Sequence, residues 1–156
     1  LPVLERQDRS GALWQVDDEW ESITTYRTYK DAKRAILAFG APAFLGAQAA
    51  TSLSKEGIQT DVHIVNGFPI ATRALEKLLG QYRDGVVTVE DGFIGTEQTG
   101  VRGFAGLVAS TTIGAGLRRA HVGITDPRIA PAEGFLETWE HFGITSEAIA
   151  SAVRDL

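Results

Sequence analysis

The 156-residue sequence predicts an α/β fold: a three-layer α/β/α sandwich around a mostly parallel five-stranded sheet with one antiparallel strand. Two observations predict it. Short runs rich in valine, isoleucine and threonine, typical of strands, alternate with segments whose leucines and alanines recur at helical spacing. The segments between the later strands are also long enough for the helical crossovers that parallel strands require.

The first two predicted strands are residues 23–29 and Arg34–Phe39. ITTYRTY alternates β-branched and aromatic residues with polar ones, whereas RAILAF is nearly all apolar, which is typical of a strand buried on both faces. Because the connecting KDAK is short, we expect these two strands to pair with each other antiparallel.

Helices and strands then alternate along the chain. A helix over about residues 43–56 places Leu45, Ala49 and Leu53 on one face, and Gly57 follows as its stop signal. Then come the strand QTDVHIVN, a helix with Leu75, Leu78 and Leu79 inward, the strand GVVTVED, a helix over about 103–112, the strand RRAHVGITD and two helical segments, the second capped by Thr145 or Ser146.

Residues 1–22 differ from the rest and predict a linker from an upstream domain, leaving residues 23–156 as one domain. The segment is polar and acidic, without sustained periodicity, and carries Trp14 and Trp20, which we expect either to pack locally or to contact a partner domain. The chain has no methionine, which favours a fragment of a longer polypeptide over a processed protein.

Composition excludes several classes of function. Fifteen basic against 20 acidic residues give a net charge of −5, and no basic cluster favours nucleic-acid binding. No apolar run approaches the roughly 20 residues of a membrane span and no signal peptide is recognisable, so we expect a cytoplasmic location. The absence of cysteine excludes disulfides and thiolate chemistry.

Glu90 and Asp91 follow directly on an apolar strand in VVTVEDGFIG. Carboxylates at the end of a strand suit an acid–base pair or a metal site, but no third group is recognisable that would separate their pKa values. The favoured interpretation is that they accept hydrogen bonds from nearby backbone amides and, with Phe93 and Ile94, face a neighbouring domain. The glycine-rich residues 92–106 match no phosphate-binding motif and favour turns and close packing over a phosphate site.

The histidines predict no active site. His63 and His121 lie in predicted strands and His141 near a helix end, without the spacing of metal ligands. A nucleophilic serine in a G-x-S-x-G turn is also missing. We therefore predict no catalytic and no metal-binding residue in this domain.

Four motifs in order resemble the C-terminal domain of transketolase-type enzymes, a family with transketolase, deoxyxylulose-phosphate synthase and the 2-oxoacid dehydrogenase β subunit. They are the run from AILAFGAP to VNGFPI, VVTVEDGFIG, HVGITD and the tail ETWEHFGITSEAIASAVRDL. Two departures are the longer glycine-rich residues 92–106, where the family has a compact GGhGSAV, and NGFPIATRALE, which replaces a proline-leucine-aspartate exit.

The resemblance implies a parent enzyme that carries two-carbon or acyl units between keto substrates with thiamine diphosphate and magnesium. In the family those cofactors are held by two other domains, whose motifs this chain lacks. The implied role is therefore a non-catalytic domain that binds no cofactor itself, supports a homodimer of the parent and borders the substrate channel. Arg73 is the nearest match to a family arginine that contacts the sugar phosphate.

Two other functions stay open from the sequence. The altered residues 92–106 also suit a standalone binding or regulatory module on the same fold. A small independent enzyme using Glu90 and Asp91 is the third possibility.

Overall fold

The computed structural model describes residues 22–96, 98–126 and 134–156. Trp14, Trp20 and nearly all of the predicted linker lie outside these residues. In chain order, the described elements are β1 (Ile23–Arg27), β2 (Arg34–Phe39), α1 (Ala43–Lys55), β3 (Thr60–Val65), α2 (Thr72–Leu79), β4 (Gly85–Phe93), α3 (Gly103–Thr111), β5 (Arg119–Ile124), α4 (Phe135–His141) and α5 (Ser146–Arg154).

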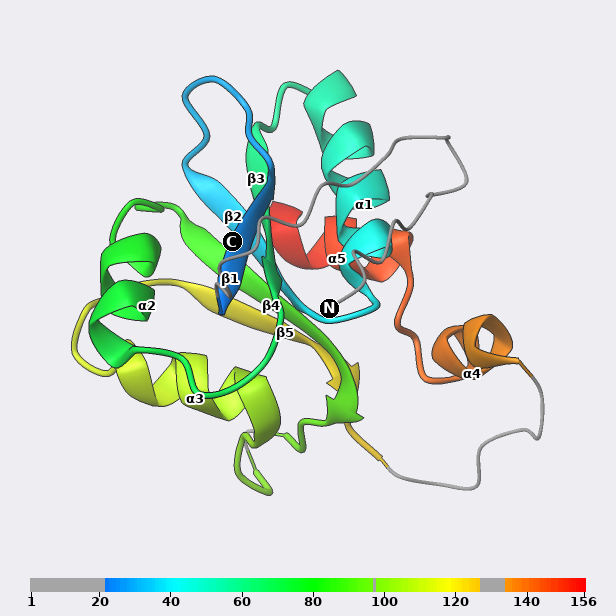
Figure 1. Cartoon of the computed structure of the whole chain (residues 1–156). Helices are drawn as coiled ribbons and strands as arrows, with labels where there is room; N and C mark the ends of the chain where they lie inside the picture. The colour runs from blue at the N-terminus through cyan, green and yellow to red at the C-terminus, as the bar shows by residue number, and fades with distance from the viewer. Residues whose placement is uncertain (1–21, 97, 127–133) are drawn as a thin grey trace, which may run out of the picture.

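The strands form a five-stranded sheet in the order β1-β3-β2-β4-β5 (Figure 1). The pairs β2–β3, β2–β4 and β4–β5 are parallel, and β1 alone runs antiparallel. The predicted fold class, a mostly parallel five-stranded sheet with one antiparallel strand, is therefore confirmed.

The predicted pairing of the first two strands is wrong. β1 pairs with β3, with Thr25 opposite His63, and β2 lies between β3 and β4. The reason is burial: Ala35 to Ala38 of β2 are fully buried, which requires a central position with a partner on each edge. The connection after β1 passes the start of β3, where the Tyr29 amide donates to the Asp61 carboxylate at 2.7 Å.

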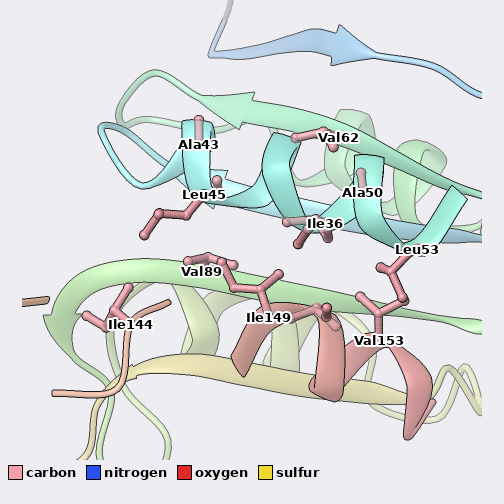
Figure 2. Close-up of a cluster of buried hydrophobic side chains, with 14 of the residues drawn as sticks. Ile36, Ala43, Leu45, Ala50, Leu53, Val62, Val89, Ile144, Ile149 and Val153 are labelled. Carbon is pink, nitrogen blue, oxygen red and sulfur yellow. The ribbon is translucent and has the colours of Figure 1, made fainter. Parts of the chain in front are cut away.

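Helices cover both faces of the sheet, which completes the three layers (Figure 1). Along β2 the side chains alternate: Ile36 and Ala38 join the cluster under α1 and α5, whereas Ala35 and Leu37 join the cluster under α2 and α3. In Figure 2, Leu53 of α1 points toward Val153 of α5, and both are fully buried.

The helix boundaries follow the predicted signals closely. Gly57 adopts φ +81° just after α1, as a terminating glycine should. Thr145 is the N-cap of α5, where its hydroxyl accepts a hydrogen bond from the Ala148 amide at 3.1 Å. In α2, Leu75 and Leu79 are buried as predicted, and Leu78 is half-buried.

Candidate functional site

The carboxyl ends of β2, β3, β4 and β5 share one edge of the sheet, because these strands are parallel. Ligands and partners of open α/β sheets favour this edge. Each of the four strands ends in or is followed by an exposed phenylalanine. Phe93 is the last residue of β4, and Phe44, Phe68 and Phe135 follow β2, β3 and β5; we call these four residues the carboxyl edge. Among the described residues only one other large hydrophobic side chain is exposed, Ile113 at the far end of α3.

Aromatic and cationic contacts hold these phenylalanines in place. The buried Trp139 of α4 packs against Phe44 and Phe135, with ring centroids 5.9 and 5.1 Å apart. Phe68 stacks on Phe39 at 5.2 Å yet remains 55% exposed. The Arg102 guanidinium carbon lies 5.8 Å from the centroid of the Phe93 ring. Fixed apolar rings exposed to solvent are typical of a surface that a partner covers.

Glu90 lies beneath this edge, 6% exposed, and its carboxylate holds the first turn of α3. It accepts hydrogen bonds from the Phe104 amide at 3.1 Å and the Ala105 amide at 2.8 Å. These amides are among the N–H groups that a helix leaves without internal partners, and a negative charge suits a helix N-terminus. The predicted acceptance of backbone hydrogen bonds is confirmed for Glu90.

Glycine is required where the chain approaches this carboxylate. Gly103 has φ +64°, and a Cβ added there would lie 2.6 Å from a carboxylate oxygen of Glu90. Gly95 has φ +68°, and an added Cβ would lie 2.5 Å from the Gly100 carbonyl oxygen. Gly95 therefore serves a tight turn and Gly103 a close helix approach, which are the roles that the sequence predicted for the glycines of this stretch.

Glu90 and Asp91 do not meet as a pair of carboxylates. Neighbouring residues of a strand face opposite sides of the sheet, and Asp91 is exposed whereas Glu90 is buried. Of the four residues predicted at an interdomain surface, Asp91 and Phe93 are accessible, while Glu90 and Ile94 are enclosed by this chain itself. The interdomain role stays a prediction.

Arg73 lies in the first turn of α2, the helix that follows the carboxyl end of β3. Its side chain is exposed, and it forms no hydrogen bond or ion pair with any described residue. It therefore lies at the same end of the sheet as the carboxyl edge, and its guanidinium is not engaged by another described side chain.

His63 belongs to a buried chain of hydrogen bonds that the sequence analysis missed. The Tyr82 hydroxyl donates to the Asp61 carboxylate at 2.9 Å, so it accepts from Nε2 of His63. Nδ1 is then unprotonated and accepts from the Thr25 hydroxyl at 3.2 Å. Burial lowers the pKa of His63, an effect partly offset by Asp61, whereas burial and the bond to Asp61 raise the pKa of Tyr82.

The other two histidines also have local partners. Nδ1 of His121 lies 2.7 Å from the Thr88 hydroxyl, and His141 packs edge-on against Phe142. Across the residues that the structure describes, no group of three histidine or acidic side chains could hold a metal ion. Within the same residues, no helix is long and apolar enough to span a bilayer.

Comparison with known proteins shows which solved structures share the fold of this chain. No protein-family model matches the sequence, and neither does any curated protein. Among solved structures, the chain is similar to a split-gene transketolase in an inactive β4 tetramer, with a TM-score of 0.70 and 23% identity. It is also similar to transketolases from Campylobacter jejuni (TM-score 0.58, 17% identity) and Leishmania mexicana (TM-score 0.55, 18% identity).

The matches cover much more of this chain than of the transketolases. The split-gene match covers 91% of this chain and 44% of the other. The other two each cover 86% of this chain and 18% of the transketolase. The chain therefore spans less than half the length of the proteins it resembles, and over most of its own length it has the fold of a transketolase C-terminal domain.

Proposed function

We propose that this chain is the non-catalytic C-terminal domain of a transketolase-like, thiamine-diphosphate-dependent transferase. The observation that carries the proposal is the fold likeness, which takes in 91% of this chain but only 44% or 18% of the proteins matched. The parent enzyme would transfer two-carbon or acyl units between keto substrates. Its thiamine diphosphate and magnesium would be bound by other domains or subunits.

The carboxyl edge is the surface that would contact those other domains. Its four phenylalanines offer apolar anchors, Arg102 supplies a charge beside Phe93, and the exposed Asp91 supplies another two residues earlier in the chain. Aromatic side chains surrounded by polar ones are the usual centre of a protein interface. A homodimer of the parent, with this domain bordering the substrate channel, completes the proposal. The tetramer formed by the split-gene transketolase supports an oligomeric parent.

Arg73 is the candidate contact to the substrate. Its guanidinium is exposed beside the carboxyl edge, and its planar set of donors matches phosphate oxygens. We propose that it binds the phosphate of a sugar-phosphate substrate once the other domains are in place.

Reconstitution tests the proposal. The chain is combined with a thiamine-diphosphate-binding chain from the same genome, and association is measured by sedimentation velocity alongside transketolase activity. The double variant Phe68→Ser, Phe93→Ser should weaken association about tenfold or more, since buried aromatic anchors each contribute about 1 kcal/mol or more. Ile113→Ser is the matched control, because Ile113 is 79% exposed but lies away from the carboxyl edge.

Several outcomes of these measurements would count against the proposal. Unchanged association of the double variant would remove the carboxyl edge as the interface. Tight binding of thiamine diphosphate by this chain alone, or ketose conversion without added protein, would overturn the non-catalytic role. For Arg73→Gln, a KM that rises equally for phosphorylated and unphosphorylated substrates would remove its phosphate contact.

A further inference from the structure

A groove of about 390 Å³ runs between the edge strand β1 and helix α2, and His63 of β3 lines it between them. The volume lies in the range of natural ligand sites. The groove belongs to the β1 side of the sheet, so it uses none of the four phenylalanines of the carboxyl edge.

The groove is hollow because α2 presents small residues to β1. Ala71 and Ala74 line it, one helical turn apart, where longer side chains would fill the space. The leucines that hold α2 to the sheet, Leu75 and Leu79, point into the core instead and are buried. Ile23 and Leu78 add apolar wall, so the interior accepts a short aliphatic chain.

The charged group at the groove is Lys77, an exposed residue in the last turn of α2. It is the only lysine, arginine or acidic side chain among the groove's lining residues, and it forms no ion pair with any described residue. The nearby Asp61 carboxylate already accepts hydrogen bonds from Tyr82 and from the Tyr29 amide. The groove therefore favours a ligand with a single negative charge, such as a carboxylate.

The polar part of the lining adds a hydrogen-bond acceptor. The Thr25 hydroxyl uses its proton on Nδ1 of His63, which leaves the lone pairs of its oxygen available. A ligand hydroxyl can donate to that oxygen without disturbing the His63 chain. We propose that the groove binds a small aliphatic hydroxycarboxylate, with its carboxylate at Lys77, its hydroxyl at Thr25 and its alkyl chain along Ile23 and Leu78.

Nuclear magnetic resonance titration of the full chain tests this site through the ring signals of His63. The probe is 2-hydroxy-4-methylpentanoate, and a saturable shift of the His63 signals is expected. Two matched compounds each remove one interaction: 4-methylpentanoate lacks the hydroxyl, and 2-hydroxy-4-methylpentanamide lacks the charge. Each should bind about threefold more weakly, the usual effect of one partly exposed polar contact.

Two variants test whether the ligand binds in the groove. Ala74→Leu should abolish the shift by filling the space, and Lys77→Gln should weaken carboxylate binding about threefold while sparing the amide. Lys55→Gln is the matched control, because Lys55 is also exposed in the last turn of a helix, α1. The proposal is overturned if His63 shows no saturable shift, if Ala74→Leu binds normally, or if inorganic phosphate binds as tightly as the hydroxycarboxylate.

Discussion

Helices α1 and α5 pack on one face of the sheet through apolar side chains, whereas α2 and α3 cover a face that also holds hydrogen-bonded polar groups. On the first face the buried cluster runs through residues such as Leu53, Ile149 and Val153, all fully buried. On the second face Leu75 and Phe104 are equally buried, but they share it with Glu90 and His63.

This difference between the two faces shows which parts of the candidate sites depend on hydrogen bonds, whose geometry is directional. Apolar packing fixes how closely α1 and α5 lie on the sheet, and many side chains of similar volume would serve. Hydrogen bonds fix orientation, so Glu90 sets the start of α3 beside the carboxyl edge and His63 sets one part of the β1–α2 groove. The β1–α2 groove therefore borders the polar face, as does Phe68 of the carboxyl edge through Phe39, whereas Phe44 and Phe135 pack against Trp139 of the apolar cluster.

The largest effect is expected on the apolar face, for Leu53→Ala. Leu53 is fully buried in the cluster shared by α1 and α5, so truncation removes apolar burial and leaves a cavity. We expect the free energy of unfolding to fall by about 3 kcal/mol, measured by urea denaturation. Leu78→Ala, at a half-buried position of α2, is the control and should lose less than half as much. Equal losses would mean that burial does not distinguish the two positions.

Glu90→Gln is the corresponding test of the polar face. A glutamine keeps the shape, but its amide group would present a donor to one of the two backbone N–H donors, and the negative charge at the helix N-terminus is lost. We expect the free energy of unfolding to fall by about 2 kcal/mol. The amides of Phe104 and Ala105 should also lose protection from hydrogen exchange.

Glu56→Gln is the matched control for this change. Glu56 accepts two hydrogen bonds from Arg154 at 2.9 and 2.8 Å, but both side chains are exposed, and such pairs contribute little. It should therefore change stability much less than Glu90→Gln. Equal effects of the two substitutions would contradict the role assigned to the buried carboxylate.

The residues that the sequence placed correctly are those whose signal is local. The alternation in β1, the apolar run of β2, Gly57 after α1 and Thr145 before α5 each depend on a few neighbouring residues. The hydrogen bonds that Glu90 accepts are less local, since the donor amides lie 14 and 15 positions later in the chain. They were still predictable, because a glycine-rich turn at the end of the strand brings backbone amides close to the carboxylate.

What the sequence could not provide depends on residues far apart in the chain. The partner of β1 follows from which strands cover β2, and no turn residue encodes that. The chain through His63 joins Tyr82, 19 positions later, to Thr25, 38 positions earlier. The carboxyl edge collects phenylalanines from four separate segments of the chain, so its continuity exists only in the folded sheet.

The smallest expected effect is the pH dependence that His63 gives to the polar face. Burial lowers the pKa of His63 in the folded chain, while in the unfolded chain it takes its ordinary value near 6.5. As the pH falls below about 6.5, the unfolded chain binds the proton first, so this contribution to stability is complete above that pH and is lost as the pH falls toward the folded pKa. One such group changes the free energy of unfolding by at most about 1.4 kcal/mol per pH unit.

Urea denaturation at intervals between pH 5 and 7.5 measures this contribution, with His63→Gln and His141→Gln compared. The second variant removes an exposed histidine and is the matched control for the loss of one imidazole ring. The slope that His63→Gln loses beyond the control is the part due to burial. Tyr82→Phe supplies an independent check: it removes the hydroxyl that accepts from Nε2, so the His63 pKa should shift while the ring stays in place. Identical slopes in His63→Gln and the unsubstituted protein would show that the buried ring contributes nothing to the pH dependence of stability, which would contradict this prediction.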